Sequence, residues 1–328
     1  MKTVTPHVKP HSRDLPLKAG TRGSPLARAQ TKTFLAMLRE FCPVLRSMDV
    51  FEEHIIVTTG DAVQNRSLAE IGGKGLFAKE IHDALAAGRI DFAVHSLKDL
   101  ETTLPPGIAL ACTLRREDAR DVLILPSDHG AVDMADPYAA LAQGARIGSA
   151  SVRRQAQLKH ARPDLRFALL RGNVGTRLSK VESGEVDATL LAYAGLRRLG
   201  LADKASVVLS AELMVPSACQ GIVGITVREA DTELLSLLSG IEDPEAKAVA
   251  TAERALLGAL DGSCRTPIGG YARVLDDGSL HLTGLVARAD GSFLLKRTAT
   301  CAVADAEEMG RELGLSLKAD SPSDIFAL

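Results

Sequence analysis

The chain has 328 residues, 46% of them hydrophobic and 24% charged, so it can bury a substantial core and is long enough for two or three compact domains. This balance argues against disordered and fibrous proteins. A net charge of −2, with three Tyr and no Trp, supplies neither the basic stripe nor the stacking aromatics of a nucleic-acid-binding protein. Any anion site must therefore be local.

Targeting and redox signals favour a cytoplasmic protein. Residues 1–14 are polar and lack the apolar core of a signal peptide, and no apolar run approaches membrane-spanning length, so we expect no membrane partner. The eight His residues include no close ligand pair, so no metal is expected. The cysteines are odd in number and lack paired metal spacing, which indicates a reducing compartment. They are Cys42, Cys112, Cys219, Cys264 and Cys301.

Over about the first two-thirds of the chain, apolar runs alternate with helical patterns. This alternation predicts a mainly parallel sheet covered by helices on both faces. Residues 126–144 have the composition of a loop. In chain order, the expected elements are a helix at Leu26–Phe41, a strand at His54–Thr59, a helix at Phe77–Leu85, and strands at Ile90–His95, Ile108–Thr113, Val122–Leu125, Arg146–Gly148, Arg166–Leu170, Asp187–Leu191 and Ile222–Val227.

The pattern changes after Pro244. One helix at Glu245–Leu260 leads to a Gly-rich loop and then to three alternating runs. Asp277-Gly278 and Asp290-Gly291 join these runs, and both dipeptides favour tight hairpins because Gly accepts a positive φ. The sequence therefore predicts a small antiparallel sheet with helices against one face.

Two Gly-containing motifs precede helices. In Thr21-Arg22-Gly23-Ser24-Pro25, Ser24 can cap the helix and Arg22 lies beside its N-terminus, an arrangement that would hold a carboxylate. A capped helix with a surface arginine is an equal alternative. In Gly72-Gly73-Lys74-Gly75, Gly75 stands where a phosphate loop needs Ser or Thr, so we reject a nucleotide site. This segment is either a mobile flap carrying Lys74 or an ordinary connection.

Polar residues follow several predicted strands, at the edge where open α/β sheets bind ligands. Lys98 could hold a carboxylate, and Asp99 could stabilise positive charge on a substrate nitrogen and shuttle protons, although the two could also form a surface ion pair. A second group favours a polycarboxylate or phosphate site over solvated arginines. It comprises Ser149, Ser151, Arg153, Arg154, Arg171 and Arg177.

Cys264 lies in Asp261-Gly262-Ser263-Cys264-Arg265-Thr266-Pro267, a loop that follows the long helix. The neighbouring arginine favours the thiolate, so this is the most plausible reactive cysteine of the five. A buried, unreactive thiol is the alternative.

These motifs, in this order, resemble the porphobilinogen deaminase family from about Leu17 to Glu312. Each motif is weak alone, but the ordered set is specific. The matching stretches are Thr21 to Ala27, Gly72 to Phe77 with Lys79-Glu80, Val94 to Asp99, Arg153 to Gln155, Leu170 to Leu178, Thr251 to Arg254, and Gly262 to Ile268.

The resemblance implies an α/β fold of two periplasmic-binding-protein-like domains plus a small α+β C-terminal domain with a three-stranded antiparallel sheet. Domain 1 would be discontinuous, at 15–114 and 218–240, and domain 2 would span 118–215. Domain 3, at 244–328, would carry the cofactor cysteine. The sequence itself places the boundary between the first two near Arg115–Arg120, a charged stretch between two predicted strands.

The resemblance also implies a function, in which four porphobilinogen molecules are deaminated and joined on a dipyrromethane held by Cys264 through a thioether. Asp99 would be the catalytic carboxylate, Lys74 would lie in the flexible loop over the cleft, and the protein would be a monomer. Side chains of the remaining motifs would hold acetate and propionate groups. Those for the cofactor are Lys98, Ser149, Ser151, Arg153, Arg154 and Arg177, and those for the substrate are Arg22, Ser24, Arg171 and Arg177. Asp99 would also bind the cofactor, through its pyrrole nitrogens.

Four departures from the family pattern stand out, at Glu70, Glu101-Thr102, Ala150 and Cys219. Cys219 adds a β-carbon where the backbone would favour a positive φ. None removes a residue assigned to chemistry. Two other functions remain open: a two-lobed small-anion-binding or sensing module of similar fold, and an enzyme whose free Cys264 thiol is the nucleophile.

Overall fold

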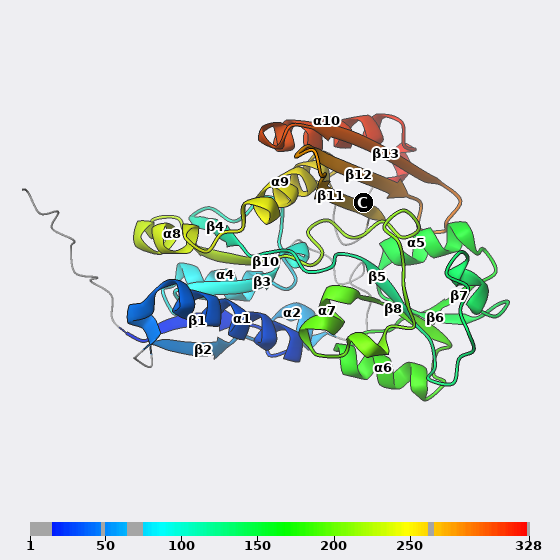
Figure 1. Ribbon diagram of the computed structural model, residues 1–328, viewed down its shortest axis with the longest axis horizontal. Coiled ribbons are helices and arrows are strands. Elements are labelled where there is room, and N and C mark those ends of the chain that lie inside the picture. The colour runs from blue at the N-terminus through cyan, green and yellow to red at the C-terminus, as the bar shows by residue number, and fades with distance from the viewer. Residues whose placement is uncertain (1–14, 47–49, 64–74, 262–265, 327–328) are drawn as a thin grey trace, which may run out of the picture.

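The computed structural model describes residues 15–46, 50–63, 75–261 and 266–326 (Figure 1). These residues form two five-stranded sheets and one three-stranded sheet, each with its own helices. The fold is therefore mixed α/β, and the C-terminal antiparallel sheet predicted from the sequence is confirmed. Within the described part of the chain, no helix is long and apolar enough to cross a membrane.

The first sheet has the strand order β2-β1-β3-β10-β4. Its apolar core lies between the sheet and its helices, and Phe34 packs edge-on against Phe92 there. The strands are β1 (Leu17–Thr21), β2 (Phe51–Ile55), β3 (Phe92–Ser96), β4 (Ile108–Thr113) and β10 (Val223–Arg228), and the helices are α1 (Pro25–Phe41), α2 (Thr59–Ala62), α4 (Lys79–Ala86) and α8 (Thr232–Ser239).

The second sheet has the order β7-β6-β8-β5-β9 and lies beside the first (Figure 1). Buried Leu123, Ile147 and Leu190 form the centre of its core. The strands are β5 (Asp121–Ile124), β6 (Arg146–Gly148), β7 (Arg166–Ala168), β8 (Ala188–Ala192) and β9 (Val207–Val208), and the helices are α5 (Val152–Ala161), α6 (Val174–Glu182) and α7 (Tyr193–Arg198).

Strand direction confirms the expectation of mainly parallel sheets, with one strand reversed in each of the first two sheets. In the first sheet β1 is parallel to β2 and β3, but β10 is antiparallel to β3 and β4. The second sheet repeats this: β6 is parallel to β7 and β8, while β5 is antiparallel to β8 and β9. The chain crosses between the sheets after β4 and again before β10. A strand that enters from the neighbouring sheet runs against those built locally.

The third sheet is antiparallel throughout, in the order β11-β12-β13. Both predicted hairpins are present, with positive φ at Gly278 (81°) and Gly291 (82°). Two helices cover this sheet (Figure 1). The elements are α9 (Pro244–Ala259), β11 (Ile268–Val274), β12 (Leu280–Ala287), β13 (Leu294–Cys301) and α10 (Ala306–Ala319).

One predicted strand is misplaced. The strand expected at His54–Thr59 lies earlier, as β2, and the helix α2 begins at Thr59. The apolar residues Ile55 and Val57 suggested a buried strand, but both are exposed. The short strands β1 and β9 were not predicted. Short 3-10 helices complete the described residues at Pro43–Arg46, Leu97–Asp99, Pro137–Ala140, Ala202–Lys204, Val303–Asp305 and Ser323–Ile325.

Candidate active site

A cavity of about 510 Å³ lies where the strand ends of the first two sheets face each other. Such strand ends are where open α/β sheets bind ligands. Seven residues predicted from the sequence line this cavity together: Arg22, Ser24, Lys98 and Asp99 from the first sheet's side, and Arg154, Arg171 and Arg177 from the second.

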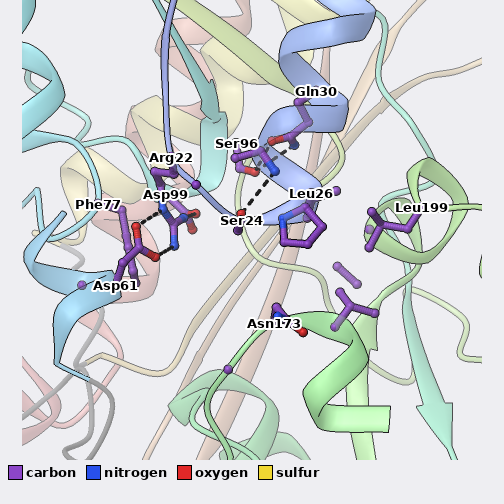
Figure 2. Close-up of a pocket in the computed structure, with 18 of the residues that line it drawn as sticks. Arg22, Ser24, Leu26, Gln30, Asp61, Phe77, Ser96, Asp99, Asn173 and Leu199 are labelled. Atoms are coloured by element: carbon purple, nitrogen blue, oxygen red, sulfur yellow. Dashed lines mark hydrogen bonds and ion pairs between the residues drawn. The ribbon is translucent and has the colours of Figure 1, made fainter. Parts of the chain in front are cut away.

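Arg22 follows β1 and is held on several sides (Figure 2). Its Nε and Nη2 donate to the two carboxylate oxygens of Asp61 at 3.0 and 2.5 Å, and Nη1 donates to Asp99 Oδ2 at 3.4 Å. The guanidinium carbon lies 4.2 Å from the centre of the Phe77 ring, within cation–π range. Burial alone would lower the pKa of Arg22, but the bond to Asp61 and the nearby Asp99 charge outweigh it. The arginine therefore stays charged.

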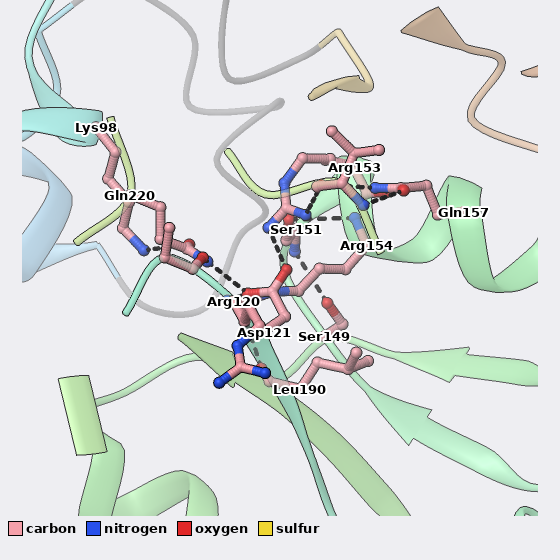
Figure 3. A network of polar contacts seen from close by, with 12 residues as sticks. Lys98, Arg120, Asp121, Ser149, Ser151, Arg153, Arg154, Gln157, Leu190 and Gln220 are labelled. Carbon is pink, nitrogen blue, oxygen red and sulfur yellow. Dashed lines mark hydrogen bonds and ion pairs between the residues drawn. The ribbon is translucent and has the colours of Figure 1, made fainter. Parts of the chain in front are cut away.

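Lys98 lies in the 3-10 turn after β3 and donates to Gln220 Oε1 at 3.1 Å (Figure 3). Burial, together with the positive charge of Arg154, lowers the pKa of Lys98 to about 8. Asp99 and Asp121 oppose this shift without cancelling it. The Gln220 amide donates in turn to Ala119 O at 2.7 Å and to Asp121 Oδ1 at 2.8 Å, so the lysine's partner is itself fixed.

Asp121 is fully buried between two arginines (Figure 3). Arg153 Nη2 and Arg154 Nη2 each lie 2.8 Å from one of its oxygens. Burial alone would raise the pKa of Asp121, but the two guanidinium groups hold it well below its usual range. Arg153 also donates to Val215 O at 2.6 Å and does not line the cavity, whereas Arg154 does.

The two predicted serines of the second sheet lie beside the cavity rather than on its surface. Ser149 is buried, and its hydroxyl accepts from the Ser151 N–H at 3.1 Å. Ser151 caps α5 by accepting from the Arg154 N–H at 3.4 Å. Ser24 caps α1 in the same way, accepting from the Ala27 N–H at 3.2 Å, which confirms the predicted cap.

Arg171 and Arg177 follow β7 on the opposite wall. Arg171 Nη2 donates to Gly60 O at 2.8 Å, a contact that joins the two sheets across the cavity. Arg177 Nε donates to Gly172 O at 3.0 Å. Burial, followed by the charges of Arg154 and Arg171, lowers the pKa of Arg177 to about 10. Within the described residues, no carboxylate forms an ion pair with Arg177 or Lys98.

Cys264, Lys74 and Glu70 lie outside the described residues. Of the other cysteines, Cys112 and Cys219 are buried, and burial raises the pKa of each thiol to about 12. Cys219 has φ 61°, which confirms the positive φ expected at this position. The described residues contain no cluster of three or more His, Cys, Asp or Glu side chains able to hold a metal ion.

Four residues that shape this site were not predicted as site residues from the sequence: Asp61, Phe77, Asp121 and Gln220. Asp61 lies just after the misplaced strand, and Asp121 begins a buried strand. The sequence could have indicated Asp121, because its carboxylate directly precedes an apolar run and a buried charge needs a partner. Gln220 offered no comparable signal.

A cation-rich cavity thus lies between the strand ends of two α/β sheets, the place where open α/β sheets bind ligands. Residues 17–236 match the model of the porphobilinogen deaminase dipyrromethane cofactor binding domain, and residues 247–319 match that of the porphobilinogen deaminase C-terminal domain. The chain belongs to the porphobilinogen deaminase family.

Curated relatives cover nearly the whole chain. It is 44% identical to a chloroplastic porphobilinogen deaminase of Oryza sativa over 94% of this chain and 85% of that protein. It is also 44% identical to the Nitrobacter winogradskyi porphobilinogen deaminase over 96% of both chains. The Sorangium cellulosum porphobilinogen deaminase is 45% identical over 92% of this chain and 98% of that one.

Solved structures of periplasmic proteins are more distant. The VFT2 domain of Bordetella pertussis BvgS is 16% identical, with a TM-score of 0.40, over 72% of this chain and 91% of that one. A putative sulfonate-binding protein of Methylobacillus flagellatus is 14% identical, with a TM-score of 0.36, over 75% of this chain and 68% of that one. At this distance they say nothing about the ligand of this chain.

Proposed function

We propose that this chain is a transferase that deaminates porphobilinogen and joins four molecules head to tail on an enzyme-bound dipyrromethane, then releases hydroxymethylbilane by hydrolysis. Membership of the porphobilinogen deaminase family supports the reaction and the cofactor. The structural observation that carries the proposal is the cavity in which Lys98 and Arg177 have no carboxylate partner among the described residues, beside the carboxylate of Asp99.

The charges of the cavity fit a dipyrromethane. Each pyrrole of porphobilinogen and of the oligopyrrole built from it carries an acetate and a propionate group. The binding site therefore needs many cations to balance these carboxylates. Burial, and then the positive charge of neighbouring arginines, lowers the pKa values of Lys98 and Arg177. Ligand carboxylates would compensate these positive charges through charge-assisted hydrogen bonds. A volume of about 510 Å³ also lies within the usual range of ligand pockets.

The assigned roles follow the two walls of the cavity. Arg22 and Ser24 on one wall, with Arg171 and Arg177 on the other, bind the carboxylates of substrate and growing chain. The cofactor's carboxylates are bound by Lys98, Arg154 and Arg177, with Arg153, Ser149 and Ser151 contributing from the layer behind. The residues of that layer fix Arg154: Arg153 shares Asp121 with it, and Ser151 caps its helix.

Asp99 is the proposed catalytic carboxylate. When bound, the dipyrromethane supplies the anchored pyrrole end to which substrate is joined. Asp99 stabilises positive charge on pyrrole nitrogens and holds the protons that move during loss of ammonia and coupling. Arg22, 3.4 Å away, keeps one oxygen of this carboxylate oriented.

Three further assignments complete the proposal. Cys264 carries the dipyrromethane through a thioether, and Lys74 belongs to a loop over the cleft. The three sheets correspond to domain 1 (15–114 and 218–240), domain 2 (118–215) and domain 3 (244–328), as the sheet membership of their strands supports. The protein works as a cytoplasmic monomer.

The intact mass of the denatured protein tests the function and the cofactor together. We expect an added dipyrromethane on the wild-type chain and none on Cys264→Ala, with peptide mapping placing the adduct on Cys264. A wild-type chain without the adduct is first incubated with porphobilinogen, because the purified protein can be apo. If no adduct forms even then, the protein is an anion-binding or sensing module instead.

A further inference from the structure

The guanidinium of Arg22 is divided between two carboxylates (Figure 2). Asp61 accepts hydrogen bonds from Nε and Nη2, which form one edge of the guanidinium. This leaves Nη1 to donate to Asp99. The Asp61 contact is the closer one, at 2.5 Å against 3.4 Å for Asp99. Planar guanidinium groups prefer two parallel bonds to one carboxylate. Without Asp61, Arg22 would therefore form two parallel hydrogen bonds with Asp99 and occupy both of its carboxylate oxygens.

Asp61 is itself fixed in place. Its Oδ2 accepts from the Thr58 hydroxyl at 2.8 Å, and its N–H donates to Thr58 O at 3.0 Å. Phe77 packs against the same turn so closely that a β-carbon on Gly60 would lie 2.2 Å from its ring. The ring that supports Arg22 thus also supports the turn that carries Asp61.

The same turn contacts the opposite wall of the cavity. Gly60 N–H donates to Leu76 O at 2.8 Å, and Gly60 O accepts from Arg171 at 2.8 Å. One short turn therefore holds an arginine from each sheet. Its geometry is set by backbone bonds and by the Phe77 ring, so it is preorganised rather than induced.

We infer that Asp61 is a positioning residue for the reaction, which acts through Arg22. It anchors one edge of the guanidinium so that Asp99 keeps an oxygen for substrate while Nη1 still orients its other oxygen. Asp61 contacts neither substrate nor the reacting atoms in this scheme. The inference rests on the proposed function, since Asp99 and Arg22 take their roles from it.

A double-mutant cycle tests this inference. Four holoproteins are compared for kcat and KM with porphobilinogen: wild type, Asp61→Asn, Arg22→Ala, and the double variant. Asparagine keeps the shape but presents an N–H₂ group to the guanidinium, so we expect kcat/KM to fall about tenfold, mainly in kcat. In the Arg22→Ala background the same substitution should change kcat/KM by less than about twofold. Equal losses in both backgrounds, or no loss in either, would overturn the inference.

Two further variants separate positioning from folding. Asp61→Glu keeps the carboxylate and should recover part of the kcat that Asp61→Asn loses. Thr58→Val removes the hydroxyl that fixes Asp61, so it should lower kcat in the same direction and lose its effect in the Arg22→Ala background. It replaces Asp61→Asn in the cycle if that variant does not fold. If Thr58→Val lowers kcat equally in the wild-type and Arg22→Ala backgrounds, the inference is contradicted.

The matched control is Glu53→Gln. This substitution breaks the ion pair between Glu53, in β2, and Arg28, in α1, whose Nε lies 2.8 Å from Glu53 Oε1. Neither residue lines the cavity, so kcat and KM should stay at wild-type values. Intact mass first shows that each protein carries dipyrromethane. A wild type without adduct and without turnover refutes the proposed function, whereas an active wild type with no coupling between Asp61 and Arg22 refutes this inference alone.

Discussion

At the scale of single residues, the basic groups of the cavity show how strongly this site requires an anion. Burial disfavours charge on Lys98 and Arg177, and neighbouring arginines add repulsion. Arg22 behaves in the opposite way, because Asp61 and Asp99 compensate it. Lys98 and Arg177, which form no ion pair with a carboxylate of the described residues, are the cations whose charge a ligand carboxylate can compensate.

Lys98 makes this requirement measurable through pH. Its pKa in the empty protein is about 8, below the ordinary lysine value of 10.5, so it loses its proton as pH rises through about 8. A polycarboxylate such as citrate binds the protonated form better. We expect the thermal stabilisation of the apo variant Cys264→Ala by citrate to weaken between about pH 7 and 9, as the charge disappears.

Lys98→Arg, made in the same apo variant, is the control for this prediction. Arginine stays protonated across the range, so the citrate effect should be nearly constant up to pH 9. A decline of the same size in both proteins would show that another group titrates.

At the scale of elements, α9 and α10 illustrate how small residues set a helix contact. A β-carbon on Gly310 would lie 2.2 Å from Ala252 O, and one on Gly314 would lie 2.7 Å from the Ala259 side chain. The two helices can therefore approach closely only where these glycines face α9. This contact covers one face of the third sheet.

A pair of glycine substitutions tests this contact. Gly310→Ala should lower the free energy of unfolding by about 1–3 kcal/mol, because the added methyl group forces the helices apart. Gly258→Ala, on α9, meets nothing within 4 Å, so it should be neutral or stabilise by up to about 1 kcal/mol through helix propensity. Urea unfolding midpoints of the two variants measure the difference. Similar midpoints would mean that α10 can move away from α9 without loss of stability.

At the scale of the whole molecule, Glu253 connects the three sheets. This fully buried carboxylate of α9 accepts from Arg116, in the first chain crossing, at 2.7 Å. It also accepts from the backbone N–H of Cys219, in the return crossing, at 2.5 Å, and from that of Ala272, in β11, at 2.6 Å. Burial raises the pKa of Glu253, and the contacts with Arg116 and the backbone oppose that shift.

Glu253→Gln should therefore destabilise the whole molecule. It leaves the Arg116 guanidinium partly buried without its counter-charge, a change that typically costs about 3–5 kcal/mol. The thermal midpoint measures the loss. Glu308→Gln, an exposed acid of α10 whose contact with Arg311 is 4.0 Å, should shift the midpoint little. A small effect of Glu253→Gln would show that the sheets are held together by apolar packing instead.

Much of the local structure was predictable from the sequence. The bounds of β4 and β6 coincide with the predicted ones, both hairpins form at Asp-Gly, and Ser24 caps its helix. Each depends on residues close together in the chain. The rule that ligands bind at strand ends likewise brought Lys98 and Asp99 into the predicted site.

The sequence by itself determined the family, through the order of its motifs, and the local elements, through caps, turns and apolar periodicity. Only the tertiary structure decided which strand of each sheet is reversed and which cations are compensated by a carboxylate. Arg153 and Arg154 find Asp121, and Arg22 finds Asp61, across 32, 33 and 39 residues respectively. Such pairs form only when the fold brings these residues together, because ion pairing depends on distances in space that spacing along the sequence does not set.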